Sequence, residues 1–124
     1  MEAHVNPRMV GDIAVLDVSG ELDLYTCPKL KEAIDALLAQ GYTRLLVNLQ
    51  ETTYLDSTAL SILSSALKQV RDTDAGGNVG LIYSRPQVER MFAITGLNEV
   101  FPVFRSESDA LNTARTWAAG RLKT

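Results

Sequence analysis

Two hydrophobic patterns alternate along the chain, one typical of strands and one typical of helices. Short runs rich in β-branched and apolar residues predict strands. These runs occupy residues 13–19, 44–49 and 79–83. Gly20 is expected to end the first run, and residues 4–10 are expected to pair with it through a tight turn at 11–12. The run 44–49 is apolar on both faces except at Asn48, as in a central strand with parallel neighbours, and a short loop is expected after it.

Longer segments place apolar residues three and four positions apart, which indicates helices with one apolar stripe. The first helix is predicted to open at Pro28 and to be stopped by Gly41. The second begins beside a short polar cluster and carries its stripe as far as Val70. The chain is expected to break at residues 74–78, which are rich in turn-forming residues.

The last part of the chain predicts two further helices and one more strand. A helix opens at Pro86 and stops at Gly96. Residues 100–104 are expected to form a short edge strand, since a proline within them would weaken a central one. A weak capping box at Ser106 then starts a helix whose stripe reaches Trp117.

The order of these elements predicts a fold class. Strands and helices alternate after an initial pair of strands. This order is typical of an α/β domain with a mixed, mostly parallel sheet, here of four to five strands with about four helices. In such sheets, sites gather where the carboxyl ends of strands meet the N-termini of helices.

Composition points to one domain and narrows the choice of partners. The 124 residues are 46% hydrophobic, which is enough for one full core, and no repeat or linker divides them. The formal net charge of −3 disfavours direct binding to nucleic acid. No apolar run reaches the roughly 18 residues of a membrane span, and the first residues lack a signal-peptide pattern. We therefore expect a cytoplasmic protein.

Few residues could support catalysis. The one cysteine, Cys27, rules out an internal disulfide and a multi-cysteine metal site. The one histidine, His4, lies in an N-terminal segment that we expect to be loose and exposed. A Ser-His-Asp triad or a multi-histidine metal site would need a histidine placed inside the fold. We therefore expect no enzymatic activity, no metal and no cofactor.

The segment YLDSTALSIL, residues 54–63, puts three short polar side chains together at a predicted helix start. Asp56, Ser57 and Thr58 are all good N-caps, and a lost cap costs typically about 1 kcal/mol. If Asp56 caps the helix, the Ser57 hydroxyl is free at the first helical position. If Ser57 caps it, Asp56 lies just outside and still favours the positive helix end. Either way the cluster exceeds what capping requires.

A second interpretation of this cluster is a phosphoacceptor. A phosphoserine adds about −1.5 to −2 charge and three acceptor oxygens. The amides and dipole of a helix N-terminus tolerate that charge, whereas the neighbouring Asp56 repels it. Because these effects oppose each other, we expect little refolding. The consequence would fall on a partner docked over the helix start.

Three segments of the chain resemble the STAS-domain anti-sigma factor antagonists of bacteria. They are SGELDLYTCPKLKEAI (19–34), LLVNLQETTYLDSTALSIL (45–63) and RPQVERMFAITGLNEVF (85–101). The middle segment resembles the family's D-S-[ST]-[GA]-[LI] phosphorylation signature. The resemblance covers roughly residues 8–115 and implies a single STAS domain over 1–124.

The resemblance implies partner switching in transcription regulation. The unphosphorylated antagonist binds an anti-sigma factor, which is a serine kinase, and so frees a sigma factor. The kinase phosphorylates the serine directly after the motif aspartate, here Ser57. The phosphoprotein dissociates, and a metal-dependent serine phosphatase resets it. The oligomeric state, monomer or weak dimer, stays open.

The resemblance also implies which residues face the partner. Asp23 of a Gly-Glu-Leu-Asp turn and the residues around 56–58 match the partner-facing segments, and Glu21 lies in the same turn. Glu21 and Asp23 have a simpler interpretation as solvated turn charges. Asn48 matches a recurrent strand asparagine, and we favour a buried amide that bonds loop backbone.

Two positions depart from the usual family pattern. Ala59 stands where many antagonists have glycine; it suits a helix better, but its methyl group would hinder very close approach by a partner backbone. Thr58 stands where some relatives have a second serine and is a secondary candidate acceptor. Both residues are expected on the partner-binding surface.

Three other functions are alternatives to this interpretation, and the sequence disfavours two of them. STAS domains also serve as accessory subunits of membrane transporters, in which case Ser57 is only a cap or a contact residue. A nucleotide hydrolase is disfavoured, since no GxxxxGK[ST] loop is present and the glycine pair at 76–77 is too short a phosphate signal. A receiver domain phosphorylated on aspartate needs two adjacent carboxylates after an early strand, which Glu21 and Asp23 imitate poorly.

Overall fold

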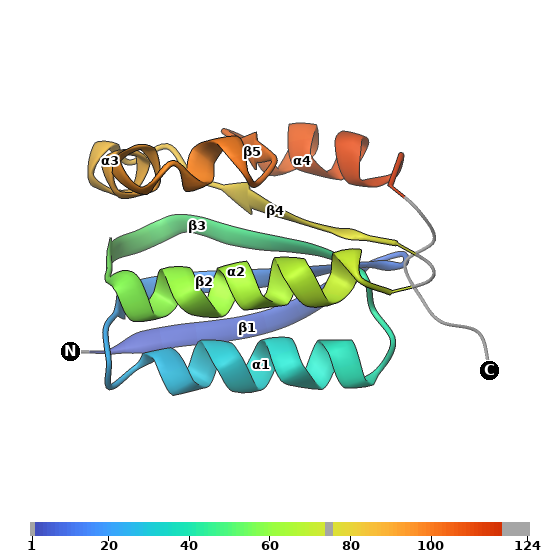
Figure 1. Ribbon diagram of the computed structural model, residues 1–124, viewed down its shortest axis with the longest axis horizontal. Helices are drawn as coiled ribbons and strands as arrows, with labels where there is room; N and C mark the ends of the chain where they lie inside the picture. The colour runs from blue at the N-terminus through green and yellow to red at the C-terminus, as the bar shows by residue number, and fades with distance from the viewer. Residues whose placement is uncertain (1, 74–75, 118–124) are drawn as a thin grey trace.

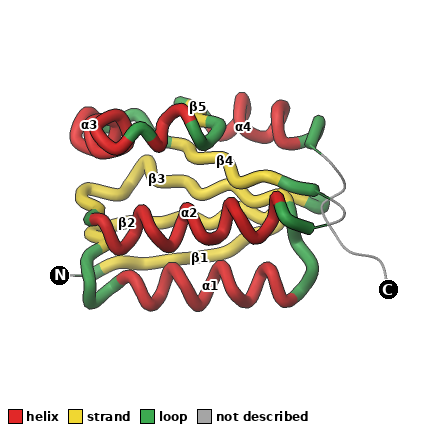
Figure 2. Tube along the Cα trace, viewed as in Figure 1, coloured by secondary structure: helices red, strands yellow, loops and turns green. Residues whose placement is uncertain are grey.

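Over residues 2–73 and 76–117, which the computed structural model describes, five strands form one mixed sheet. The strands are β1 (Ala3–Val10), β2 (Ile13–Leu22), β3 (Arg44–Leu55), β4 (Asn78–Ile82) and β5 (Val103–Phe104). They lie side by side in chain order (Figures 1 and 2). β1 is antiparallel to β2, and the other neighbouring pairs are parallel. The predicted α/β fold with a mixed, mostly parallel sheet is confirmed.

Four α-helices cover the sheet in the described part of the chain. They are α1 (Cys27–Ala39), α2 (Ser57–Arg71), α3 (Pro86–Thr95) and α4 (Glu107–Ala114), and a 3-10 helix, η1 (Leu97–Glu99), follows α3. None of the helices described here has the length and apolar character that crossing a membrane requires. The helix ends follow the predicted signals: prolines lie in the first turns of α1 and α3, and Gly96 ends α3. The hydroxyl of Ser106 caps α4 by accepting a hydrogen bond of 3.2 Å from the amide of Asp109.

The helices divide between the two faces of the sheet. Side chains of α1, α2 and α3 pack in the large core on one face, and α4 packs in a smaller core on the other. Alternation along β3 serves both cores: Leu45 and Val47 point into the large one, and Leu46 points into the small one. All three are fully buried, as predicted for a central strand.

Two strands run past the ends that the sequence predicts. The expected loop after residue 49 is the second half of β3, which continues to Leu55. β2 likewise continues through Gly20 to Leu22. Most of the predicted Gly-Glu-Leu-Asp turn is therefore strand, and the turn itself begins at Asp23.

Pairing between β2 and β3 explains the extra length. The register shifts twice around Gly20, and pairing then resumes as far as Leu22 opposite Leu55. The buried Thr52 hydroxyl donates a hydrogen bond of 3.0 Å to the carbonyl of Val18, which joins the later part of β3 to β2. Register shifts break the alternation of apolar and polar residues, so the pattern hides the second half of each strand.

The chain ends also differ from the prediction. His4 lies in β1 opposite Ser19, so the predicted pairing of residues 4–10 with 13–19 is confirmed and the expectation of a loose segment is wrong. The His4 side chain is exposed as expected. The predicted edge strand 100–104 is reduced to β5. α4 ends before Trp117, whose side chain still packs against the small core. Of the predicted break, residues 74–75 lie outside the described residues.

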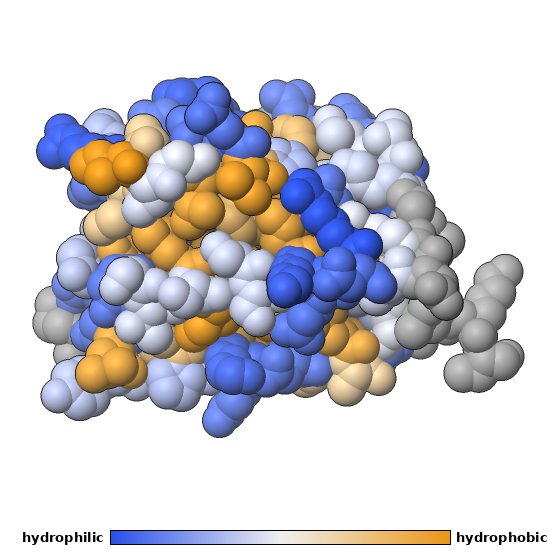
Figure 3. Space-filling model, viewed as in Figure 1, coloured by the Kyte–Doolittle hydropathy of each residue, from blue (hydrophilic) through white to orange (hydrophobic). Residues whose placement is uncertain are grey.

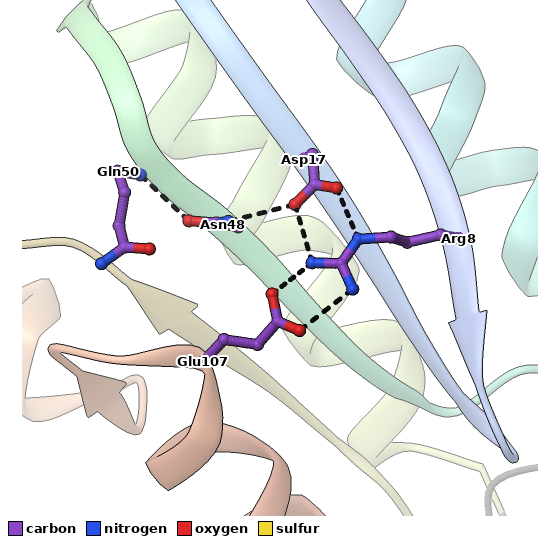
Figure 4. Close-up of polar contacts among 5 residues, drawn as sticks. All are labelled: Arg8, Asp17, Asn48, Gln50 and Glu107. Atoms are coloured by element: carbon purple, nitrogen blue, oxygen red, sulfur yellow. Dashed lines mark hydrogen bonds and ion pairs between the residues drawn. The ribbon is translucent and has the colours of Figure 1, made fainter.

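A polar cluster joins α4 to three strands on the face of the sheet that α4 covers (Figure 4). Arg8 of β1 donates from Nε to Asp17 of β2 at 2.6 Å and from Nη1 to Glu107 of α4 at 3.0 Å. The hydrogen bond from Arg8 holds the pKa of Asp17 below its usual range. The Asn48 amide donates to Asp17 at 3.0 Å and accepts from the Gln50 amide at 3.1 Å. Asn48 thus bonds backbone as expected, but it is half-buried and has a carboxylate as its second partner.

Exchanging Gly20 for alanine tests the shifted pairing of β2. Gly20 has φ of 87°, and a Cβ there would collide with the Glu2 carbonyl oxygen. Gly20→Ala should therefore lower the free energy of unfolding by about 3–4 kcal/mol, from backbone strain and collision together. Gly11 is the matched control, since its φ is 62° with nothing within 4 Å of the added Cβ. Gly11→Ala should cost only the strain, about 1–2 kcal/mol, in urea denaturation. Equal losses at the two positions would contradict the collision.

Candidate functional site

The predicted polar cluster lies where β3 ends and α2 begins, at the left end of Figure 1. Asp56 is the N-cap of α2, because its Oδ1 accepts hydrogen bonds from the amides of Thr58 at 2.9 Å and Ala59 at 3.3 Å. Ser57 is the first helical residue and is exposed. The structure thus selects the first capping alternative, and the Ser57 hydroxyl takes no part in the cap.

The next two residues face different ways. Thr58 is half-buried and lines a hollow of about 500 Å³ between α1 and the start of α2. Ala59 is 0% exposed and packs in the large core. The expectation that its methyl group meets a partner is therefore wrong. With Asp56 as the cap, position 59 falls on the inward face of α2, with Leu60 and Leu63.

Asp23 organises the turn that leads from β2 into α1. Its Oδ1 accepts hydrogen bonds from the amide of Tyr25 at 2.9 Å and from the amide of Thr26 at 3.0 Å. These bonds, the one from the Thr26 amide above all, hold the pKa of Asp23 below its usual range. The Thr26 hydroxyl donates in turn to the Glu21 carbonyl at 2.6 Å. The interpretation of Asp23 as a merely solvated charge is wrong, because its carboxylate shapes the turn.

Glu21 lies at the end of β2, opposite Tyr54 of β3. The residue is half-buried, and its Oε2 is buried without a hydrogen-bond partner among the described residues. Glu21 is therefore not a freely solvated turn charge either. A buried carboxylate oxygen without a hydrogen bond lowers the stability of the fold, so a donor that reached Glu21 Oε2 would be favoured.

The structure brings the two predicted segments together. The Asp56 amide donates a hydrogen bond of 3.1 Å to the Leu22 carbonyl, which ties the start of α2 to the end of β2. Cys27 lies between the segments: burial, then the charges of Asp56 and Asp23, raise the pKa of its thiol to about 11. The thiol therefore stays protonated at neutral pH, which makes it unreactive.

Exposed apolar side chains surround this end of the molecule, and the sequence analysis missed them. Leu24 is 64% exposed, Tyr25 87%, Tyr54 47% and Ile94 75%. Figure 3 shows hydrophobic surface over α3 and in the hollow between α3 and α2. One signal was available for Ile94, which lies off the helical stripe of Val88, Met91 and Phe92. Leu24 and Tyr25 follow the end of a strand, where single apolar residues carry no clear pattern.

The arrangement presents a modifiable hydroxyl on an open surface. Ser57 stands at the positive end of α2, a helix of 15 residues, and directly follows the Asp56 carboxylate. Within the ranges 2–73 and 76–117, no group of three or more His, Cys, Asp or Glu residues is placed to hold a metal ion.

Comparisons with known proteins agree with this geometry. The family model of the STAS domain matches residues 4–110. An anti-sigma-B factor antagonist of Staphylococcus epidermidis is 34% identical over 103 residues, which are 83% of this chain and 94% of that protein. The crystal structure of an anti-sigma factor antagonist from Mycobacterium paratuberculosis is similar with a TM-score of 0.84 and 28% identity, over 92% of this chain and 95% of that one.

The phosphorylated form of the Bacillus cell fate determinant SpoIIAA has the same fold. Its TM-score is 0.69 at 20% identity, over 90% of this chain and 100% of that one. At this identity the likeness concerns the fold alone.

Substitutions at the start of α2 test the assignment of the cap. Asp56→Ala should lower the free energy of unfolding by about 1 kcal/mol, because two amides lose their acceptor. Asp56→Asn is the matched control, since asparagine caps as well as aspartate, and it should change stability by only a few tenths of a kcal/mol. Ser57→Ala should stay within about 0.5 kcal/mol of the parent in urea denaturation. A larger loss in Ser57→Ala than in Asp56→Ala would show that the serine is the cap.

Proposed function

We propose that this chain, which belongs to the STAS domain family of anti-sigma factor antagonists, works by partner switching centred on Ser57. Unphosphorylated, it binds an anti-sigma factor that is also a serine kinase, and a sigma factor is released. The kinase transfers the γ-phosphoryl group of ATP to Ser57 Oγ, and the complex dissociates. A metal-dependent serine phosphatase hydrolyses the phosphoserine and restores the binding form. These partners act in the cytoplasm.

The position of Ser57 carries the proposal. Ser57 is exposed at the first position of α2, while the Asp56 carboxylate accepts the cap hydrogen bonds from the amides of Thr58 and Ala59. Phosphorylation therefore leaves the cap intact. The helix dipole favours the added charge and Asp56 disfavours it, so the fold changes little. The change is confined to the surface that a partner covers.

The surroundings of Ser57 explain how one phosphate could release a partner. The exposed apolar side chains of Leu24 and Tyr25 lie at the start of α1, in the segment that the Asp56–Leu22 hydrogen bond holds beside α2. A partner packed on them would have to desolvate about −1.5 to −2 of added charge beside the Asp23 carboxylate. A tenfold loss of affinity, about 1.4 kcal/mol, makes a useful switch and is small beside such a penalty.

The remaining candidate residues fill different roles in the proposal. Asp23 and Glu21 face the partner from the β2–α1 junction, where Glu21 offers its unbonded oxygen to a donor. Thr58 is a poorer acceptor than Ser57, because its side chain is half-buried in the hollow beside α1. The chain itself is a binding protein, and the kinase and the phosphatase supply the chemistry.

Phosphorylation by the anti-sigma factor kinase of the same organism tests the proposal. With ATP, the chain should gain one phosphate, and peptide mapping by mass spectrometry should place it on Ser57. Ser57→Ala should block the reaction yet still bind the kinase in calorimetry, because the hydroxyl is not used in packing. Ser57→Asp should bind at least tenfold more weakly while melting normally.

Thr58→Val provides the matched control, since it removes the neighbouring hydroxyl at nearly constant volume. It should be phosphorylated like the parent. Phosphate found only on Thr58, or full labelling of Ser57→Ala, would place the switch on another hydroxyl.

A further inference from the structure

A groove lies between the end of β3 and α3, on the side of Ser57 away from α1. Its volume is about 210 Å³. Its apolar lining includes Tyr54 and Leu55 from β3, and Val88, Met91 and Ile94 from α3. None of these residues belongs to the phosphorylation signature or to the turn at Asp23.

The groove has the character of a contact surface. Ile94 and Tyr54 stand at its rim and are among the few large apolar side chains exposed in the described part of the chain. Exposed apolar groups around a hollow mark interaction sites more often than chance exposure does. Met91 is half-buried in the lining, and its flexible thioether adapts to different shapes.

The groove is held in shape from beneath. Phe92, on the opposite side of α3, stacks on Tyr83 with ring centroids 5.0 Å apart and meets Phe101 edge to face at 6.4 Å. Phe92 is fully buried, so these contacts fix α3 on the sheet. A preformed groove costs a partner little ordering entropy on binding.

The charge of Arg90 indicates which kind of partner would fit the groove. Arg90 is the charged side chain in the lining; it is exposed and forms no ion pair with any residue in 2–73 or 76–117. Two charged residues that precede it are already paired: Arg85 with Glu51, and Glu89 with Arg105. A partner that fills the groove therefore complements it with apolar atoms and one carboxylate.

The groove lies close to Ser57, the proposed phosphoacceptor. Leu55 forms part of its wall and is two residues from Ser57, so their Cα atoms are within about 8 Å of each other. The groove wall and Ser57 are therefore close enough for one partner surface of about 800 Å² to cover both.

We propose that the groove receives a segment of the anti-sigma factor that carries an aliphatic side chain next to an acidic residue. The aliphatic group packs against Tyr54, Met91 and Ile94, and the carboxylate pairs with Arg90. This rests on the proposed function and adds the residues that select one anti-sigma factor over another. Residues of α3 would determine which anti-sigma factor binds, and phosphorylation at the start of α2 would release it.

Calorimetry with the purified kinase that phosphorylates Ser57 tests the groove. Ile94→Ala and Arg90→Glu should each weaken binding of the unphosphorylated chain at least tenfold, and Arg90→Lys should retain most of the affinity. Met9→Ala and Arg115→Glu are the controls, because both side chains are exposed and lie outside the groove. Both should bind within twofold of the parent. All variants should melt like the parent, since the substituted side chains are exposed.

The outcomes separate this inference from the proposed function. If the parent binds the kinase and Ile94→Ala and Arg90→Glu bind equally well, the groove is not the contact, although the switch at Ser57 stands. The same conclusion follows if Met9→Ala and Arg115→Glu lose as much affinity as the groove variants. If the parent binds no anti-sigma factor kinase at all, the proposed function fails, and the groove inference fails with it.

Discussion

The parallel pairing of β2 with β3 is the constraint on which the site depends. Because the pairing survives two register shifts, both strands end at the same level, with Leu22 opposite Leu55. The helices that follow then start side by side, and the Asp56 amide reaches the Leu22 carbonyl. Two segments more than 30 positions apart thereby share one surface. Neither polar cluster could form that surface alone.

At the start of α2, two demands fall on separate residues. A helix end needs an acceptor for its free amides, and a switch needs a hydroxyl that can change without disturbing the fold. Asp56 meets the first demand and Ser57 is free for the second. At the β2–α1 junction, Asp23 plays a part similar to that of Asp56, since its carboxylate accepts hydrogen bonds from amides of the turn. Hydrogen bonds to these two carboxylates hold both junctions without using the Ser57 hydroxyl.

Sequence patterns were sufficient for the order of the elements, the starts of the helices and the polar cluster, because each depends on local chemistry. They failed where tertiary contacts decide. The second halves of β2 and β3 follow from pairing across register shifts, which obscures alternation. Ala59 was assigned to the partner surface from the family resemblance, whereas the packing of α2 against the sheet buries it. Tyr54 resembles a core residue by type, and only packing shows that it is exposed, whereas Ile94 already lies off the apolar stripe of its helix in the sequence.

The order of strands in the sheet has a consequence for folding during synthesis on the ribosome. Each strand lies next to the one made just before it, so the sheet can grow by adding one neighbour at a time. Among the described strands, only the β1–β2 pairing closes a tight turn; each parallel pairing waits until the helix between its two strands has been made. The Ser57 surface is complete once α2 has docked, before α3 and the groove exist. A nascent chain would therefore present the proposed phosphorylation site before it has formed the groove that we propose as a partner contact.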